Sequence, residues 1–165
     1  MPQTASGVST ANTAKEEFSY KKLLQQYDFT GKVVVLTGGT GVLGSEMAVA
    51  LANCGAKLAI LDLNLAPGQA LLERMGKNAA NVKLFACNVL ERESVQKVAA
   101  DVLKEFGKID ILINGAGGNK PQATTNPDLK FFDLPADALR FVFELNLIGS
   151  ILPSQIFGKI MADQK

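Results

Sequence analysis

A run of aliphatic residues followed by closely spaced glycines constrains this chain more than any other feature. The segment is K-V-V-V-L-T-G-G-T-G-V-L-G, from Lys32 to Gly44. Its first six residues are typical of a strand buried on both faces, and a helical pattern follows the last glycine. Gly39, Gly41 and Gly44 have the G-x-G-x-x-G spacing of a loop that binds a dinucleotide at a helix N-terminus.

Each of these glycines is expected to meet a different steric demand. In order, they should allow a tight turn at Gly39, close approach of the backbone to a pyrophosphate at Gly41, and close packing of helix on strand at Gly44. Glycine-rich turns also occur in ordinary loops, so the prediction of a nucleotide site depends on the strand before and the helix after.

Composition narrows the class of protein. The 165 residues carry a net charge of +1 at pH 7, which suits one globular domain and indicates no nucleic-acid partner. Because histidine is absent, Ser–His and Cys–His catalysis are excluded and no metal site is predicted. No apolar run approaches the roughly 20 residues of a membrane span. We expect a cytoplasmic protein with Cys54 and Cys87 as reduced core residues, a disulfide being the less favoured alternative.

The rest of the chain alternates predicted strands with predicted helices. Strands are expected at 32–37, 57–62, 82–87 and 109–113, and helices at 41–54, 66–75 and 91–106. This order implies right-handed βαβ units and an α/β fold with a parallel sheet. A long loop over 118–135 should follow, and then two helices within 136–164 that meet near Leu145-Asn146. Pro153 could bend the second of them.

The N-terminal residues are expected to stand apart from this domain. Residues 1–28 are interpreted as a flexible leader in which 15–27 could form a short helix anchored by Phe18, Leu23 and Leu24. Residues 29–165 are interpreted as the nucleotide-binding domain.

Asp62 indicates which dinucleotide is bound. It ends the second predicted strand, 18 residues after Gly44, where a carboxylate can accept hydrogen bonds from both ribose hydroxyls and repel a 2′-phosphate. No arginine stands in the glycine loop or directly after Asp62, so NAD is favoured over NADP. The alternative is a carboxylate that only caps a helix or a loop.

Five ordered motifs together resemble the short-chain dehydrogenase/reductase family. They are T-G-G-T-G-V-L-G at 37–44, Asp62, Asn88-Val89, N-G-A-G at 114–117 and N-L-I-G at 146–149. The resemblance covers about 29–164 and implies a Rossmann-type doubly wound sheet, truncated here after about four strands, with strand order 3-2-1-4.

The resemblance also implies the site residues. Those expected to bind the cofactor are Thr37, Gly38, Gly39, Thr40, Gly41, Val42, Leu43, Gly44, Asp62, Leu63, Asn88, Val89, Asn114, Ala116 and Gly117. The 88–89 pair should flank the adenine, and the 114–117 group should line the nicotinamide ribose. Asn146 would be the one catalytic residue in the chain, helping to hold a proton-relay water. Its alternative role is that of a helix-break residue.

Three departures from the family pattern stand out. The usual T-G-x-x-x-G-x-G loop has Val42 at its sixth position, with the glycine one residue earlier, and Gly115 replaces the second asparagine of N-N-A-G. The S…Y-x-x-x-K half of the active site is absent, because Leu24 and Gly31 lie four residues beyond the two tyrosines. We therefore expect the cofactor-binding half of a longer enzyme, by itself inactive and prone to self-association.

The favoured function is that of an NAD-dependent oxidoreductase, which would move hydride between nicotinamide and an alcohol or ketone. The loop G-G-N-K-P-Q-A-T-T from Gly117 resembles short-chain mannonate and sugar-acid oxidoreductases, so the small-molecule substrate could be a sugar acid and the complete enzyme a dimer or tetramer. A non-catalytic dinucleotide-binding or regulatory module is the alternative, and an assembly fragment with an empty loop is a third.

Overall fold

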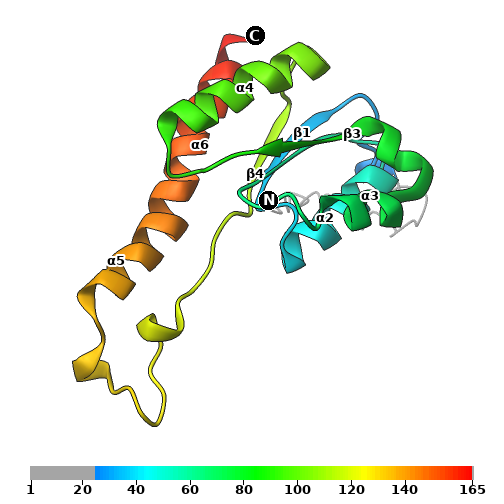
Figure 1. The fold of residues 1–165 in the computed structure, drawn as a ribbon. Helices are drawn as coiled ribbons and strands as arrows, with labels where there is room; N and C mark the ends of the chain where they lie inside the picture. Colours follow the sequence, from blue (N-terminus) through cyan, green and yellow to red (C-terminus); the bar gives the residue numbers. More distant parts are fainter. Residues whose placement is uncertain (1–24, 165) are drawn as a thin grey trace, which may run out of the picture.

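The computed structural model describes residues 25–164, and its centre is a parallel sheet covered on both faces (Figure 1). The strands are β1 (Val33–Thr37), β2 (Lys57–Asp62), β3 (Val82–Ala86) and β4 (Ile111–Asn114), in the order β3-β2-β1-β4. The α/β class and the strand order are as predicted. The leader lies almost wholly outside the described residues, as do Phe18, Leu23 and Leu24.

Helices follow the strands in the predicted alternation. They are α2 (Val42–Asn53), α3 (Gly68–Met75), α4 (Arg92–Phe106), α5 (Ala136–Phe143) and α6 (Gly149–Asp163). A 3₁₀ helix, η1 (Gly76–Asn81), continues directly from α3, although the sequence predicted that helical structure would stop at its glycine. The long loop after β4 carries two more 3₁₀ turns, η2 (Pro121–Ala123) and η3 (Phe131–Asp133).

Alternation along the central strand divides the core into two layers. Val34 and Leu36 of β1 are fully buried on the face that α2 and α3 cover, in one cluster with Leu58 and Ile60 of β2. Val35 is fully buried on the opposite face, in a cluster with residues of α4 and α6 that includes Phe157. Because every residue of β1 is buried, the aliphatic run that begins the nucleotide motif is also the middle of the core.

The fourth strand begins two residues later than predicted and ends one residue later, at Asn114. Ile109 precedes the strand because Gln164 holds both of its backbone groups, with the Ile109 N–H donating to Oε1 at 2.9 Å and Nε2 donating to its carbonyl at 2.6 Å. Pairing with β1 instead extends to Thr37 opposite Asn114. The fourth strand lies at the edge of the sheet in the described chain, with Ile111 to Ile113 only partly buried.

The two predicted C-terminal helices form one continuous helical run, and Pro153 lies inside α6 without ending it. A π-helical segment, η4 (Glu144–Ile148), joins α5 to α6 at the position where a break was predicted. The run over Ala136–Asp163 has 28 residues, and its most apolar 18-residue stretch has a mean hydropathy of 1.3 and is 22% buried. By length and composition alone it could span a membrane, which the sequence analysis did not anticipate. One such helix is weak evidence for a membrane span, since core helices of soluble proteins can have the same length and hydropathy.

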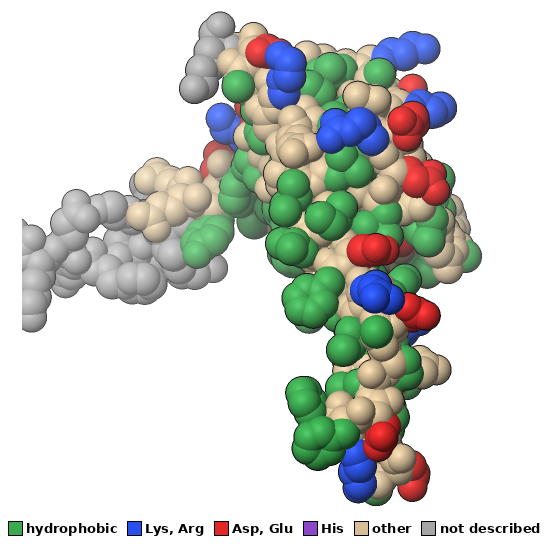
Figure 2. All heavy atoms as spheres, turned by 90° about the vertical axis from the view of Figure 1, so that its left-hand side faces the viewer, with side chains coloured by type: hydrophobic (Ala, Val, Ile, Leu, Met, Phe, Trp, Pro, Cys, Tyr) green, Lys and Arg blue, Asp and Glu red, His purple; other side chains and the backbone are tan. Residues whose placement is uncertain are grey.

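An apolar surface runs along the outer face of this helical run. Its members are Phe141, Phe143, Leu147, Ile148 and Ile151, all of which are exposed. Figure 2 shows apolar side chains continuing down the narrow part of the molecule that α5 and the preceding loop form. Phe157 is therefore a core residue, as expected, whereas the other two phenylalanines lie at the surface.

Asp110 couples the folding of the sheet to pH. Its Oδ2 accepts a 2.8 Å hydrogen bond from the Val33 N–H at the start of β1, and the Lys108 ammonium lies 2.9 Å from the same oxygen. Partial burial alone would raise the pKa of the Asp110 carboxyl, but these two donors outweigh it and lower the pKa below its usual value.

We predict that this carboxylate stabilises the fold only while it is ionised. Because its pKa is lower in the folded state, its contribution should be complete above the unfolded pKa of about 4 and lost as the pH falls through the folded pKa. Asp110→Asn should remove about 1 kcal/mol at neutral pH and flatten the acid limb of the stability curve. Urea unfolding from pH 2 to 7 tests this, with exposed Asp133→Asn as the control. Parallel curves for wild type and Asp110→Asn would contradict it.

Candidate functional site

The predicted site residues come together at the carboxyl edge of the sheet. Parallel pairing places Thr37 opposite both Leu61 and Asn114, so β1, β2 and β4 end side by side. The glycine loop follows β1 at this edge, Asp62 ends β2, and the N-G-A-G turn follows β4 (Figure 1). Ligands of open α/β sheets bind at this edge, where the connections on the two sides of a strand lead to opposite faces.

The loop's first turn contains Gly38 and Gly39, and Gly38 is the one with a left-handed conformation. Gly38 has φ +65°, and a Cβ there would lie 2.7 Å from the Cα of Ala116 and from the carbonyl oxygen of Gly115. Gly39 has no left-handed conformation. Its Cβ would instead lie 2.7 Å from the Ile60 side chain on β2. Gly39 lies inside the turn that the Gly41 N–H closes on the Gly38 carbonyl at 3.2 Å, as predicted. The positive φ falls on Gly38 instead, which the spacing of the glycines does not indicate.

Gly44 fits its predicted role of close packing. A Cβ there would collide with the carbonyl oxygen of Gly38 and lie 2.8 Å from the Cα of Gly39. At Gly41 the nearest atom is the Gly38 carbonyl oxygen at 3.3 Å, which a side chain could tolerate after a small adjustment. Contacts within the chain therefore require glycine at position 44. They do not require it at position 41, where the reason for glycine would be a ligand outside the loop.

The N-terminus of α2 presents donors to the space above the loop. Thr40 donates its N–H to Asp62, and Ser45 donates its N–H to Gly41 at 2.8 Å. Between them, the N–H groups of Val42, Leu43 and Gly44 have no hydrogen-bond acceptor among residues 25–164. No acidic side chain stands in the first turn of α2. These N–H groups and the helix dipole can therefore stabilise an external anion such as a pyrophosphate.

Asp62 lies next to this loop and is already partly engaged. Its Oδ2 accepts the Thr40 N–H at 3.1 Å and its Oδ1 accepts the Asn64 N–H at 3.2 Å. It does not cap the following helix, whose N-cap is Pro67. Each carboxylate oxygen can accept further hydrogen bonds, so this arrangement fixes the side chain and leaves room for the hydroxyls of a ribose. Leu63, beside it, is exposed.

Thr37 joins the ends of β1 and β4. It is the one polar residue among the fully buried side chains of residues 25–164. Its hydroxyl oxygen accepts the N–H groups of Gly115 at 3.2 Å and Ala116 at 3.1 Å. Asn114 extends the linkage toward α6 by donating Nδ2 to the Ser154 hydroxyl at 2.9 Å. These bonds hold the turn that is expected to line the nicotinamide ribose.

Asn88 and Val89 serve the local structure. Asn88 donates its side-chain amide to Glu91 and accepts the Leu90 N–H, which closes the turn between β3 and α4. Val89 is buried, and its side chain would lie 3.1 Å from a Cβ at Gly149, so a glycine at the start of α6 permits this contact. Contact of this pair with an adenine stays a prediction.

Asn146 clamps the loop that follows β4. Its Oδ1 accepts the Gly118 N–H at 3.1 Å, and its Nδ2 donates to the Gly118 carbonyl at 2.7 Å and to the Val142 carbonyl at 2.8 Å. Gly117 makes room, since a Cβ there would lie 2.7 Å from Oδ1. Asn146 lies in the π-helical segment, which agrees with its alternative role at a helix irregularity. Its catalytic role stays a prediction.

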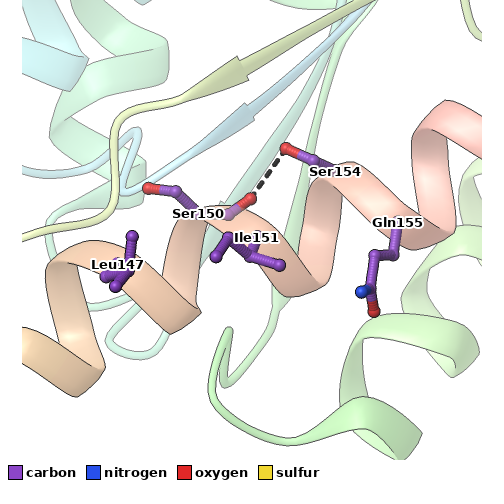
Figure 3. Close-up of a pocket in the computed structure, with 5 residues that line it drawn as sticks. All are labelled: Leu147, Ser150, Ile151, Ser154 and Gln155. Atoms are coloured by element: carbon purple, nitrogen blue, oxygen red, sulfur yellow. Dashed lines mark hydrogen bonds between the residues drawn. The ribbon is translucent and has the colours of Figure 1, made fainter.

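A pocket beside this clamp offers contact surface rather than reactive groups. It is lined by Leu147 of η4 and by Ser150, Ile151, Ser154 and Gln155 of α6 (Figure 3). The Ser150 hydroxyl donates to the Asn146 carbonyl, and the Ser154 hydroxyl donates to the Ser150 carbonyl at 2.7 Å. Both hydroxyls are thus engaged within the helix, and no titratable side chain lines this pocket.

Two features of the site were not predicted. The Ser154 contact with Asn114 joins residues 40 apart in the chain, for which the sequence carried no signal. Lys120 lies with its Nζ 4.4 Å from the ring centre of Phe141. The lysine was visible in the G-G-N-K-P-Q-A-T-T loop, but nothing in that loop indicated its aromatic partner.

Comparison with known proteins agrees with this geometry. The family model for short chain dehydrogenases matches residues 32–165. An uncharacterized oxidoreductase of Haemophilus influenzae is 39% identical over 145 residues, covering 82% of this chain and 51% of the relative. D-threitol dehydrogenase of Mycolicibacterium smegmatis is 34% identical over 145 residues, covering 87% and 53%.

A solved structure has the same fold. The crystal structure of a protein from Haemophilus influenza, provisionally described as a D-mannonate oxidoreductase with bound NAD, superposes with a TM-score of 0.76 at 37% identity. The alignment covers 84% of this chain and 53% of that one. The chain thus spans about half the length of the relatives it matches. The family match, the strand order and the glycine loop agree, and the chain belongs to the short-chain dehydrogenase family.

Proposed function

We propose that the complete protein is an NAD-dependent oxidoreductase that interconverts an alcohol and a ketone. The observation that carries this proposal is the group of three unpaired N–H donors at the start of α2, which lies directly beside the Asp62 carboxylate. The donors suit a pyrophosphate and the carboxylate suits an unphosphorylated ribose, and a dinucleotide carries both. When bound, NAD would supply the hydride acceptor.

The chain's own residues would position this cofactor rather than move protons. Thr37 and Asn146 hold the backbone on either side of the N-G-A-G turn, so the ribose next to the nicotinamide would meet a fixed surface. The proton transfer of the reaction is assigned to a tyrosine–lysine pair beyond these 165 residues. The alternative of a non-catalytic module has no support from the reported relatives, which are named as oxidoreductases or dehydrogenases.

A sugar acid is the proposed substrate class. The description of the Haemophilus protein as a D-mannonate oxidoreductase supports it, whereas the D-threitol dehydrogenase favours a neutral polyol. The protein is further proposed to be cytoplasmic, to form homo-oligomers, and to bind neither membranes nor nucleic acid. The exposed apolar surface along α5 and α6 supports an extensive contact with other protein surface (Figure 2).

The proposed reaction is tested with the complete protein. NADH absorbance should report reduction of NAD in the presence of a sugar acid or polyol. Absence of turnover across both substrate classes, in a protein that binds NADH, would contradict an oxidoreductase and favour the non-catalytic module.

Substitution at Gly44 should remove cofactor binding. Gly44→Ala places a methyl group against the Gly38 carbonyl, so the loop must move away from the position that presents its donors. We expect the affinity for NADH to fall at least tenfold, or about 1.4 kcal/mol. Fluorescence titration measures it, with circular dichroism to verify the fold. Gly158→Ala is the matched control, because no atom lies within 4 Å of a Cβ there. An unchanged affinity in folded Gly44→Ala would place the dinucleotide elsewhere.

Substitution at Asp62 should alter the choice between cofactors. Asp62→Ala removes the acceptor for the ribose hydroxyls and the charge that opposes a 2′-phosphate. The dissociation constant for NAD divided by that for NADP should therefore rise by roughly tenfold or more. Titration of NAD and of NADP against the wild type and Asp62→Ala measures this change in preference. Tighter binding of NADP than of NAD by the wild type would refute the assignment.

A further inference from the structure

We propose that Lys120 binds the carboxylate of the substrate and so selects sugar acids over neutral polyols. This inference rests on the proposed function, since it assigns a residue to recognise the substrate class at the same site. It is carried by three observations: the place of Lys120 in the fold, the support of its side chain by Phe141, and the lack of an acidic partner for it within residues 25–164.

The backbone around Lys120 is held by the site itself. Gly118, two residues earlier, is gripped through both of its backbone groups by Asn146. The Lys120 N–H donates to Asn119 Oδ1 at 2.8 Å, and its carbonyl accepts the Ala123 N–H at 2.9 Å. The loop that follows the N-G-A-G turn is therefore ordered as far as Lys120, on the side of the site expected to hold the nicotinamide.

The side chain of Lys120 is held as well. Its ammonium lies 4.4 Å from the centre of the Phe141 ring, within the range of a cation–π interaction, and the residue is half-buried. Asn146 and Phe141 belong to the same helical run, so one element positions both the start of the loop and the cation. A lysine that served only solubility would have no need of this support.

The charge of Lys120 is left without a partner. None of the ion pairs formed within residues 25–164 includes it, and no hydrogen bond to its Nζ is made within that range. Lys130, farther along the same loop, instead donates to the Pro127 carbonyl at 2.7 Å. An ammonium that lies over an aromatic ring and has no acceptor within residues 25–164 is suited to a carboxylate, while a polyol offers it no charge.

The test compares two substrates that differ only at one carbon. D-Mannonate and D-mannitol share a carbon skeleton, with a carboxylate in one and a hydroxymethyl group in the other. In the complete protein, Lys120→Met should raise the KM for D-mannonate about 10- to 100-fold, with a smaller change in kcat, because a charged hydrogen bond to the substrate is lost. Activity with D-mannitol, low in the wild type, should not fall further.

Three variants serve as controls. Lys120→Arg keeps the charge and should retain most of the preference for the acid. Phe141→Leu removes the aromatic support and should raise the KM for D-mannonate by a smaller factor. Lys104→Met removes an exposed cation from α4 and should have no effect. Titration with NADH verifies that each variant still folds. If Lys120→Met does not fold, the KM values for D-mannonate and D-mannitol are compared between Lys120→Arg and the wild type.

Each outcome decides the proposal. An acid-specific rise in KM supports it. Equal effects of Lys120→Met on both substrates, no effect on either, or a wild type that uses D-mannitol as well as D-mannonate would overturn it. A wild type that turns over neither D-mannonate nor D-mannitol would also overturn the proposal that the substrate is a sugar acid. Failure to bind NADH or to oxidise any alcohol would show in the wild type and would refute the proposed function itself.

Discussion

The close approach of the first turn of α2 to the end of β1 is the contact on which the rest of the structure depends. At Gly44 no atom larger than hydrogen fits against the Gly38 carbonyl, and at Gly38 none fits against the turn after β4. These two contacts bring a helix N-terminus and the N-G-A-G turn to the same edge of the sheet. The unpaired donors of the helix and the carboxylate of Asp62 then face a common space. The same two close contacts therefore pack α2 against the sheet and position the groups of the candidate site.

Polar side chains connect this edge to the C-terminal helices. Thr37 is buried in the core, yet its hydroxyl holds the turn after β4, and Asn146 holds the loop that follows that turn. Hydrogen bonds that a buried hydroxyl accepts from fixed N–H groups cost little to form, and losing them would leave buried polar groups unpaired. The same helical run then positions Phe141 under Lys120. A chain of contacts thus leads from the strand that opens the motif to the loop that we assign to the substrate.

Much of the fold could be predicted from the sequence, because strand and helix periodicities, glycine spacing and acid position are local signals. Prediction from the sequence fails where contacts between residues far apart in the chain determine the local structure. Gln164, 55 positions away, bonds the backbone of Ile109, which lies before the start of β4 rather than within it. The positive φ falls on Gly38, where a Cβ would meet the turn after β4. The π-helical turn at Asn146 and the pairing of Lys120 with Phe141 also depend on contacts made only in the folded chain. The sequence predicted most of the residues that gather at the carboxyl edge of the sheet, but not Ser154, Lys120 or the hydrogen bonds among them.

The central claim is that the glycine loop and Asp62 together hold NAD. A crystal structure of the complete protein with NAD tests it most directly. We expect the pyrophosphate within hydrogen-bond distance of the N–H groups at the start of α2, and the adenosine ribose hydroxyls bonded to the Asp62 carboxylate. A dinucleotide bound away from this edge, or a ribose that makes no contact with Asp62, would contradict it.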